Sequence, residues 1–171
     1  EQLPGVETIK LPVTESSKID DLVVGITDFH AGAKYTGSLI SEDYSVDVFK
    51  NKLRSSVKLT NDREAKNVHL VIAGDIVECI NLMHENQFKG LEEEGYGVGI
   101  VFKTYEILVE EVFNKINNLS SISLVSGNHD RDTPNNKNMN SAAVDILVYL
   151  LKQQFSLSKS KVIVNYHPDL V

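Results

Sequence analysis

The sequence is poor in cysteine and proline and has no tryptophan. Cys79 is the one cysteine among 171 residues, so no disulfide can form within the chain, as is usual in a reducing compartment. No uninterrupted apolar run approaches the roughly 18 residues that a membrane span needs. The sequence does not begin with basic residues followed by an apolar run, so no signal peptide is visible. We therefore expect a cytoplasmic protein without a membrane segment.

Positive charge is also scarce, because 17 Lys and Arg residues stand against 24 Asp and Glu, for a net charge of −7. This balance argues against binding of duplex nucleic acid through overall charge, although bound metal ions can reverse the sign of a local site. The length fits one domain over residues 1–171, with 42% hydrophobic residues for its core. Residues 1–20, with two prolines and a polar stretch, are expected to form an irregular or edge-strand leader.

Short apolar runs rich in β-branched residues alternate with segments of helical period. The runs cover 22–27, 68–73 and 122–126, and a last short one covers 161–165. Such runs are typical of buried strands. Helical spacing of apolar residues covers 46–57, 101–116 and 142–155. The alternation predicts an α/β fold with a mostly parallel sheet and flanking helices. His69 lies inside the second run, and we expect it to pack in the core.

A polar cluster follows each of the first three strands. These clusters are Asp-Phe-His at 28–30, Gly-Asp-Ile-Val-Glu at 74–78 and Gly-Asn-His-Asp at 127–130. Each has an ordinary explanation as a turn or a cap. However, the carboxyl ends of parallel strands lie on one edge of a sheet, so all three clusters would meet. Their oxygen and nitrogen donors suit divalent Mn, Fe, Zn or Ni. The side chains expected there are Asp28, His30, Asp75, Asn128 and His129.

In this order the three motifs resemble those of the calcineurin-like metallophosphoesterases, over roughly residues 22–131. The resemblance implies the N-terminal half of an αββα sandwich and two divalent metal ions, with Mn expected first and Fe, Zn or Ni as alternatives. It implies that Asp28 and His30 bind the first metal. Asp75 would bridge both metals, and Asn128 would bind the second.

The resemblance also implies the chemistry, in which a hydroxide held between the metals attacks phosphorus in line. His129 would lie beside the scissile phosphate and stabilise or protonate the leaving oxygen, with Asp130 orienting it. Arg131 follows directly and is a candidate phosphate contact, or else an ion-pair partner of a nearby carboxylate. His84 is a candidate substrate contact, or else part of a solvated helix face.

Two features depart from the family pattern. Glu78 stands where many members have Asp or Asn, and it can still contact a metal ligand from behind. The two later motifs, Gly-His and Gly-His-x-His, are absent, since the only histidine after residue 130 is His167 in a different context. We therefore expect the N-terminal part of a longer protein, with weak metal occupancy and little activity of its own.

These motifs predict an enzyme that hydrolyses phosphate mono- or diesters with two metal ions. One alternative is a DNA exonuclease or endonuclease of the recombination-repair type. Nucleic acid would then bind through a missing C-terminal part or a partner subunit, because the chain has no basic stripe interleaved with aromatic residues. The other alternative is a non-catalytic fragment that keeps the fold.

Overall fold

The computed structural model describes residues 9–13, 17–37, 43–80, 91, 97–131, 142–158 and 160–167. The elements in chain order are β1 (Ile19–Thr27), α1 (Val46–Asn61), β2 (Ala65–Ala73), α2 (Gly97–Leu108), the π-helix η2 (Val109–Phe113), β3 (Leu119–Val125), α3 (Ala142–Leu157) and β4 (Ile163–His167). The strands form one parallel sheet in the order β1-β2-β3-β4. The predicted α/β fold with a parallel sheet and flanking helices is confirmed.

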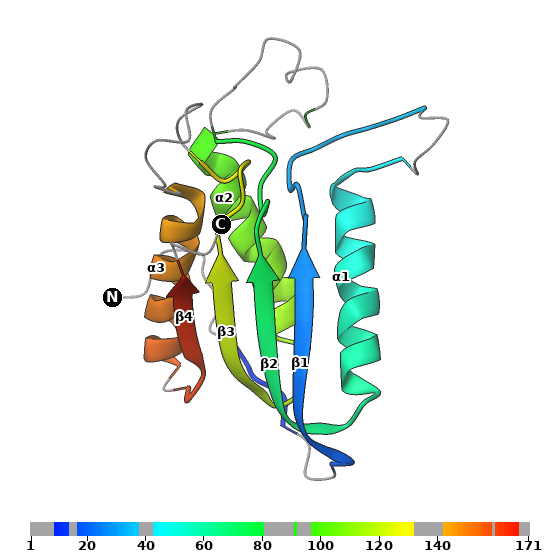
Figure 1. Cartoon of the computed structure of the whole chain (residues 1–171), viewed down its shortest axis with the longest axis vertical. Helices are drawn as coiled ribbons and strands as arrows, with labels where there is room; N and C mark the ends of the chain where they lie inside the picture. Colours follow the sequence, from blue (N-terminus) through cyan, green and yellow to red (C-terminus); the bar gives the residue numbers. More distant parts are fainter. Residues whose placement is uncertain are drawn as a thin grey trace.

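The helices cover one face of the sheet, and α2 passes behind the strands in Figure 1. The strand order follows the chain in one direction, so right-handed crossovers place every helix on the same side. Alternate residues of the strands, such as Val24, Ile72 and Leu124, therefore pack into the core with the helices. Their neighbours on the opposite face, such as Val23 and Ile163, are 68% and 61% exposed. The strands are thus buried on one face only within the described residues.

Helix α1 forms because three buried residues, Phe49, Leu53 and Val57, recur every four positions and make one apolar stripe. Its first turn is capped by Ser45, whose side chain accepts a hydrogen bond from the N–H of Val48. The helix runs from the polar end of β1 back to the start of β2. It therefore places the loop after β1 next to its own N-terminus (Figure 1).

The structure corrects the sequence expectations at two places. β1 begins at Ile19, inside the expected leader, while residues 9–13 are irregular and bury Ile9 in the core. His69 is not a packed core histidine. Its side chain is 36% exposed on the open face of the sheet, where its Nδ1 lies 2.8 Å from the hydroxyl of Ser121 and its Nε2 lies 3.2 Å from Asp21.

Within the part of the chain that the structure describes, no helix combines the length and the apolar character that crossing a membrane requires.

Glu111 of η2 is a fully buried carboxylate that ties this helix to α1. Arg54 of α1 donates from Nε to its Oε2 over 2.9 Å and from Nη2 to its Oε1. Lys115 donates to Oε2 as well. The hydrogen bond from Arg54 is the main reason that the pKa of Glu111 falls from 4.5 to about 2, against the opposing effect of burial.

The low pKa of Glu111 predicts a stability contribution that is present above pH 4.5 and lost as pH falls toward about 2, because the unfolded chain binds the proton more readily in that window. We expect Glu111→Gln to lower the free energy of unfolding by about 1–3 kcal/mol at pH 7. The variant should also flatten the dependence of stability on pH between these limits. Thermal unfolding at several pH values measures both effects.

The neighbouring Glu110→Gln is the matched control, because the Glu110 side chain is 64% exposed. We expect the control to change the free energy of unfolding by no more than about 0.5 kcal/mol. Equal losses of stability in the two variants would show that the ion pairs of the buried Glu111 do not stabilise the fold.

Candidate metal site at the carboxyl ends of the strands

The segments after β1 and β2 remain paired beyond the ends of the strands. The N–H of His30 donates to the carbonyl of Asp75 over 2.8 Å, and the N–H of Ala31 donates to the carbonyl of Ile76 over 3.1 Å. The N–H of Glu78 donates back to the carbonyl of Ala31 over 2.9 Å. These bonds fix the register of the two loops, so the polar residues of both motifs lie at the same level above the sheet.

Three of the expected metal ligands have left-handed backbone conformations. The φ angles are 54° for Asp28, 44° for His30 and 47° for Asp75. Asp and His adopt this region more often than most residues, but it still costs about 1–3 kcal/mol at each position. Such conformations cluster where a side chain has to be aimed at a particular place. Their occurrence at these positions supports a functional role for this group of side chains.

The side chains of Asp28, His30 and Asp75 come together as the sequence predicted. Their ligand atoms all lie within 4.8 Å of one another, close enough to share one metal ion. The third motif approaches the same place, because the backbone N–H of His129 donates to Oδ1 of Asp75 over 2.8 Å. Asn128, the expected ligand of the second metal, is exposed on the same turn.

Gly127 allows the third motif to approach this closely. A Cβ built on Gly127 would lie 2.2 Å from both the backbone nitrogen and Oδ1 of Asp75. Real Cβ contacts essentially never occur at that distance, and the backbone nitrogen cannot move away as a side chain could. The glycine of Gly-Asn-His-Asp is therefore required for packing against Asp75, which the sequence motif alone did not explain.

We expect Gly127→Ala to lower the free energy of unfolding by about 1–3 kcal/mol, because the methyl group overpacks the crevice. The displaced Asp75 should also bind metal less tightly. Gly99→Ala in α2 is the matched control, since a Cβ there meets no heavy atom within 4 Å. The control should be neutral or more stable by up to about 1 kcal/mol, because alanine favours a helix. Denaturant unfolding measures both, and equal stabilities would contradict the packing role of Gly127.

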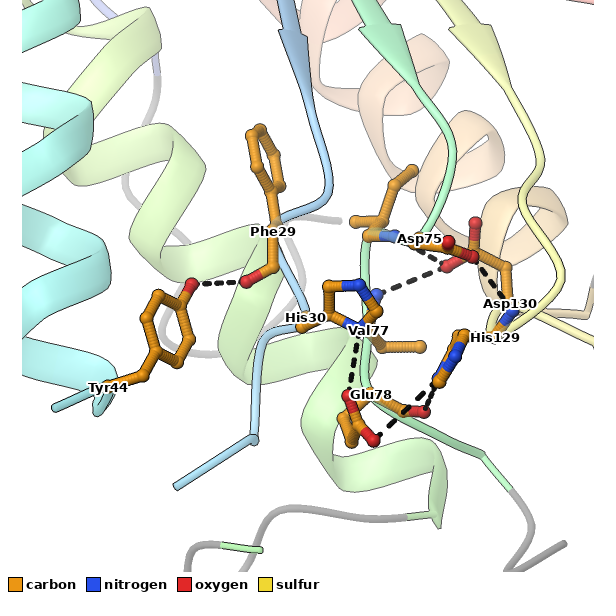
Figure 2. Close-up of polar contacts among 9 residues, drawn as sticks. Phe29, His30, Tyr44, Asp75, Val77, Glu78, His129 and Asp130 are labelled. Carbon is orange, nitrogen blue, oxygen red and sulfur yellow. Dashed lines mark hydrogen bonds and ion pairs between the residues drawn. The ribbon is translucent and has the colours of Figure 1, made fainter. Parts of the chain in front are cut away.

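Glu78 contacts both histidines of the site, as Figure 2 shows. Its Oε2 lies 2.8 Å from Nδ1 of His30, and its backbone carbonyl oxygen lies 2.8 Å from Nδ1 of His129. Its Oε1 is 3.7 Å from the same nitrogen of His129. The two imidazole rings lie nearly perpendicular, at 82°, with centroids 4.6 Å apart. Glu78, which departs from the family pattern in the sequence, is therefore the residue that contacts both histidines.

These contacts define how each histidine can act. A carbonyl oxygen only accepts, so Nδ1 of His129 carries a proton and Nε2 is left for a substrate. The carboxylate of Glu78 likewise leaves Nε2 of His30 for a metal, as in many carboxylate–histidine–metal arrangements. The hydrogen bond to Glu78 also raises the pKa of His30 above 6.5. A metal bound at His30 therefore competes with a proton.

We expected the carboxylate of Asp130 to orient His129. In the structure it accepts hydrogen bonds from backbone N–H groups instead. It is completely buried. Its Oδ1 accepts from the N–H groups of Ile76 and Val77 at 2.7 and 3.1 Å, and its Oδ2 accepts from the N–H of Gly127 at 2.8 Å. Burial raises the pKa of Asp130, while these three bonds act in the opposite direction. Asp130 thus joins the β2 and β3 turns, and Glu78 takes the orienting contact.

Neither of the two expected substrate contacts is established by the structure. Arg131 is only 8% exposed, which leaves little of its guanidinium open to a phosphate. His84 lies outside the residues that the structure describes. Both remain predictions from the sequence.

The pattern Asp-x-x-Glu at residues 75–78 was the signal for the role of Glu78, but only the folded loop places that side chain between two histidines. An alternative metal cluster is also geometrically possible, because ligand atoms of His30, Glu78 and His129 lie within 4.8 Å of one another. In comparisons with protein-family models and with curated proteins, nothing matches this chain.

Proposed function

We propose that this protein hydrolyses phosphate mono- or diesters with the help of two divalent metal ions, in the manner of the calcineurin-like metallophosphoesterases. One observation carries the proposal. The ligand atoms of Asp28, His30 and Asp75, which lie in the segments after two different strands, gather within 4.8 Å of one another, and the third motif is hydrogen-bonded to Asp75. The same residues are those that the family motifs assign to the metals.

The donor set fits a first-row divalent metal. Two carboxylates and one imidazole suit Mn, Fe, Zn or Ni, and a carboxylate such as Asp75 can share its two oxygens between two ions. Asp28, His30 and Asp75 would hold one metal, and Asp75 with Asn128 would contribute to the second. When bound, such ions would neutralise charge on a phosphoryl group and activate water.

The residues of the chain supply orientation and proton transfer. His129 is held by the hydrogen bond from its Nδ1 to the carbonyl of Glu78, which presents Nε2 to the leaving oxygen of a substrate. The carboxylate of Glu78 also lies close to this ring, with Oε1 3.7 Å from Nδ1. Cys79 is buried, and its burial raises its pKa to about 11, so this thiol is a poor nucleophile.

The architecture is compatible with this proposal. A parallel sheet with helices on one face is what the first half of an αββα sandwich needs, because the second sheet of such a sandwich packs on the other face. The open face carries exposed apolar residues such as Val23 and Ile163, together with polar ones such as His69.

The proposal is tested by metal binding and by hydrolysis with the same sample. Calorimetry with Mn²⁺ should detect weak binding that EDTA reverses. The same protein should cleave a chromogenic phosphomonoester and diester slowly, and only when Mn²⁺ is present. A labelled DNA single strand in a parallel reaction distinguishes a nuclease from a phosphatase. Binding without any cleavage would support a non-catalytic fragment, and absence of both would overturn the proposal.

A further inference from the structure

A cavity of about 330 Å³ lies between β1 and α1, directly beside the metal site. It is lined by residues 25–29 and by Tyr44, Phe49, Lys52, Leu53 and Ser56. Its volume is at the lower end of the roughly 300–1,000 Å³ that is usual for small-molecule sites. Asp28 belongs both to this lining and to the metal cluster, so the two sites share a wall.

The lining includes buried apolar side chains that form a floor. Phe29, Phe49 and Leu53 are 4%, 2% and 2% exposed. The rings of Phe29 and Phe49 are 5.1 Å apart between centroids and tilted by 46°. Phe29 is the middle residue of the Asp-Phe-His motif, so the floor is attached to the two metal ligands on either side of it. An apolar floor of this kind offers few partners to water and favours an aromatic ring.

A cation stands at the edge of the same cavity. Lys52 is exposed, and its Nζ lies 5.4 Å from the centre of the Tyr44 ring. Within the described residues it has no carboxylate partner, and it is the one cation in the lining. The hydroxyl of Tyr44 donates to the carbonyl of Phe29, and Figure 2 shows this contact on the side of the motif away from His129. Burial raises the pKa of Tyr44 to about 12, so its hydroxyl stays neutral.

We propose that this cavity binds the aromatic part of the substrate, and that the substrate is an aryl or heteroaryl phosphoester with a second anionic group. The ring would lie on Phe29 and Phe49, and the second anion, a carboxylate or a further phosphate, would pair with Lys52. The reacting phosphoryl group would lie at Asp28, across the shared wall. This assignment of substrate class rests on the proposed function.

The cavity is tested first without metal, so that the result does not depend on the proposed function. Amide chemical shifts of ¹⁵N-labelled protein in EDTA are followed during titration with benzoate, benzyl alcohol and acetate. Benzoate, which has both a ring and an anion, should bind at least fivefold more tightly than the other two and shift residues 25–29. Lys52→Gln should lower the affinity for benzoate at least fivefold and change the affinity for benzyl alcohol less than twofold. Lys58→Gln, on the same helix but outside the lining, should change neither of these two affinities.

Filling the cavity gives a second variant. Ser56→Phe should abolish the binding of both aromatic ligands, whereas Ser55→Phe, at the exposed neighbouring position outside the lining, should leave it within twofold. If Ser56→Phe fails to fold, Lys52→Gln still decides the result. Absence of benzoate binding, or acetate binding as tightly as benzoate, would overturn the inference.

The second stage adds Mn²⁺ and measures hydrolysis of 4-carboxyphenyl phosphate, phenyl phosphate and methyl phosphate. Lys52→Gln should raise KM for the carboxylated substrate at least fivefold with little change in kcat, and should leave KM for methyl phosphate unchanged. Equal effects on all three substrates would overturn the proposed substrate class. Ligand binding in the first stage without any hydrolysis in the second would overturn the proposed function and leave the cavity as a ligand site.

Discussion

Asp75→Asn is expected to lower the affinity for Mn²⁺ roughly a hundredfold or more, since loss of a mere supporting contact already costs about 10–100-fold. Asp75 contributes to the cluster with Asp28 and His30. The resemblance to the metallophosphoesterases implies that Asp75 binds both metals. The amide oxygen can still accept the hydrogen bond from the N–H of His129, so the turn should survive. Calorimetry measures the affinity, and thermal unfolding in EDTA checks that the variant is folded.

Asp145→Asn is the control for Asp75→Asn, because Asp145 is an exposed carboxylate on α3 outside the metal cluster. The control loses the same charge from the chain, so it separates a specific ligand from a general effect of net charge. Similar Mn²⁺ affinities in the two variants would mean that Asp75 binds no metal.

His129→Ala should lower the rate of metal-dependent hydrolysis by about 10²–10⁴-fold, the usual contribution of a general acid. The affinity for Mn²⁺ should change by less than a few-fold, because the proposed role of His129 is proton transfer and not metal ligation. Steady-state rates with saturating Mn²⁺, together with calorimetry, measure the two effects separately.

His69→Ala is the matched control for His129→Ala. His69 is also a partly exposed histidine with two hydrogen-bond partners, but it lies in the middle of the open sheet face. Its replacement should leave the rate within about twofold. If His129→Ala keeps a rate within a few-fold of the parent, the general-acid role is wrong. If it loses Mn²⁺ as well, His129 belongs to the metal site through the cluster with His30 and Glu78.

The resemblance implied that Asp130 orients His129, whereas in the structure Glu78 contacts both histidines. A carboxylate one methylene longer than aspartate lies 2.8 Å from His30 and 3.7 Å from His129 with its two oxygens. One residue therefore orients a proposed metal ligand and a proposed general acid together. Asp130, to which the resemblance assigned the orienting contact, instead joins the turns after β2 and β3, which carry Glu78 and His129.

The sequence by itself determined the class of fold and the set of polar residues at the crevice. Runs of β-branched residues and helical spacing of apolar residues are local patterns, so they predicted the sheet and its helices within a few residues. The common edge of parallel strands then predicted that Asp28, His30 and Asp75 would meet, and they do. Both predictions needed only local patterns and the assumption that the strands are parallel. Neither needed a contact between particular distant residues.

Only the tertiary structure decided which side chains touch. His69 looked like a core residue because its strand is apolar. Successive side chains of a strand point to opposite faces, and the helices cover one face of this sheet, so His69 lies on the open face. Glu78 reaches two histidines, Gly127 leaves room for Asp75, and a cavity opens between β1 and α1. Each depends on distances between segments far apart in the chain, which a local pattern does not encode.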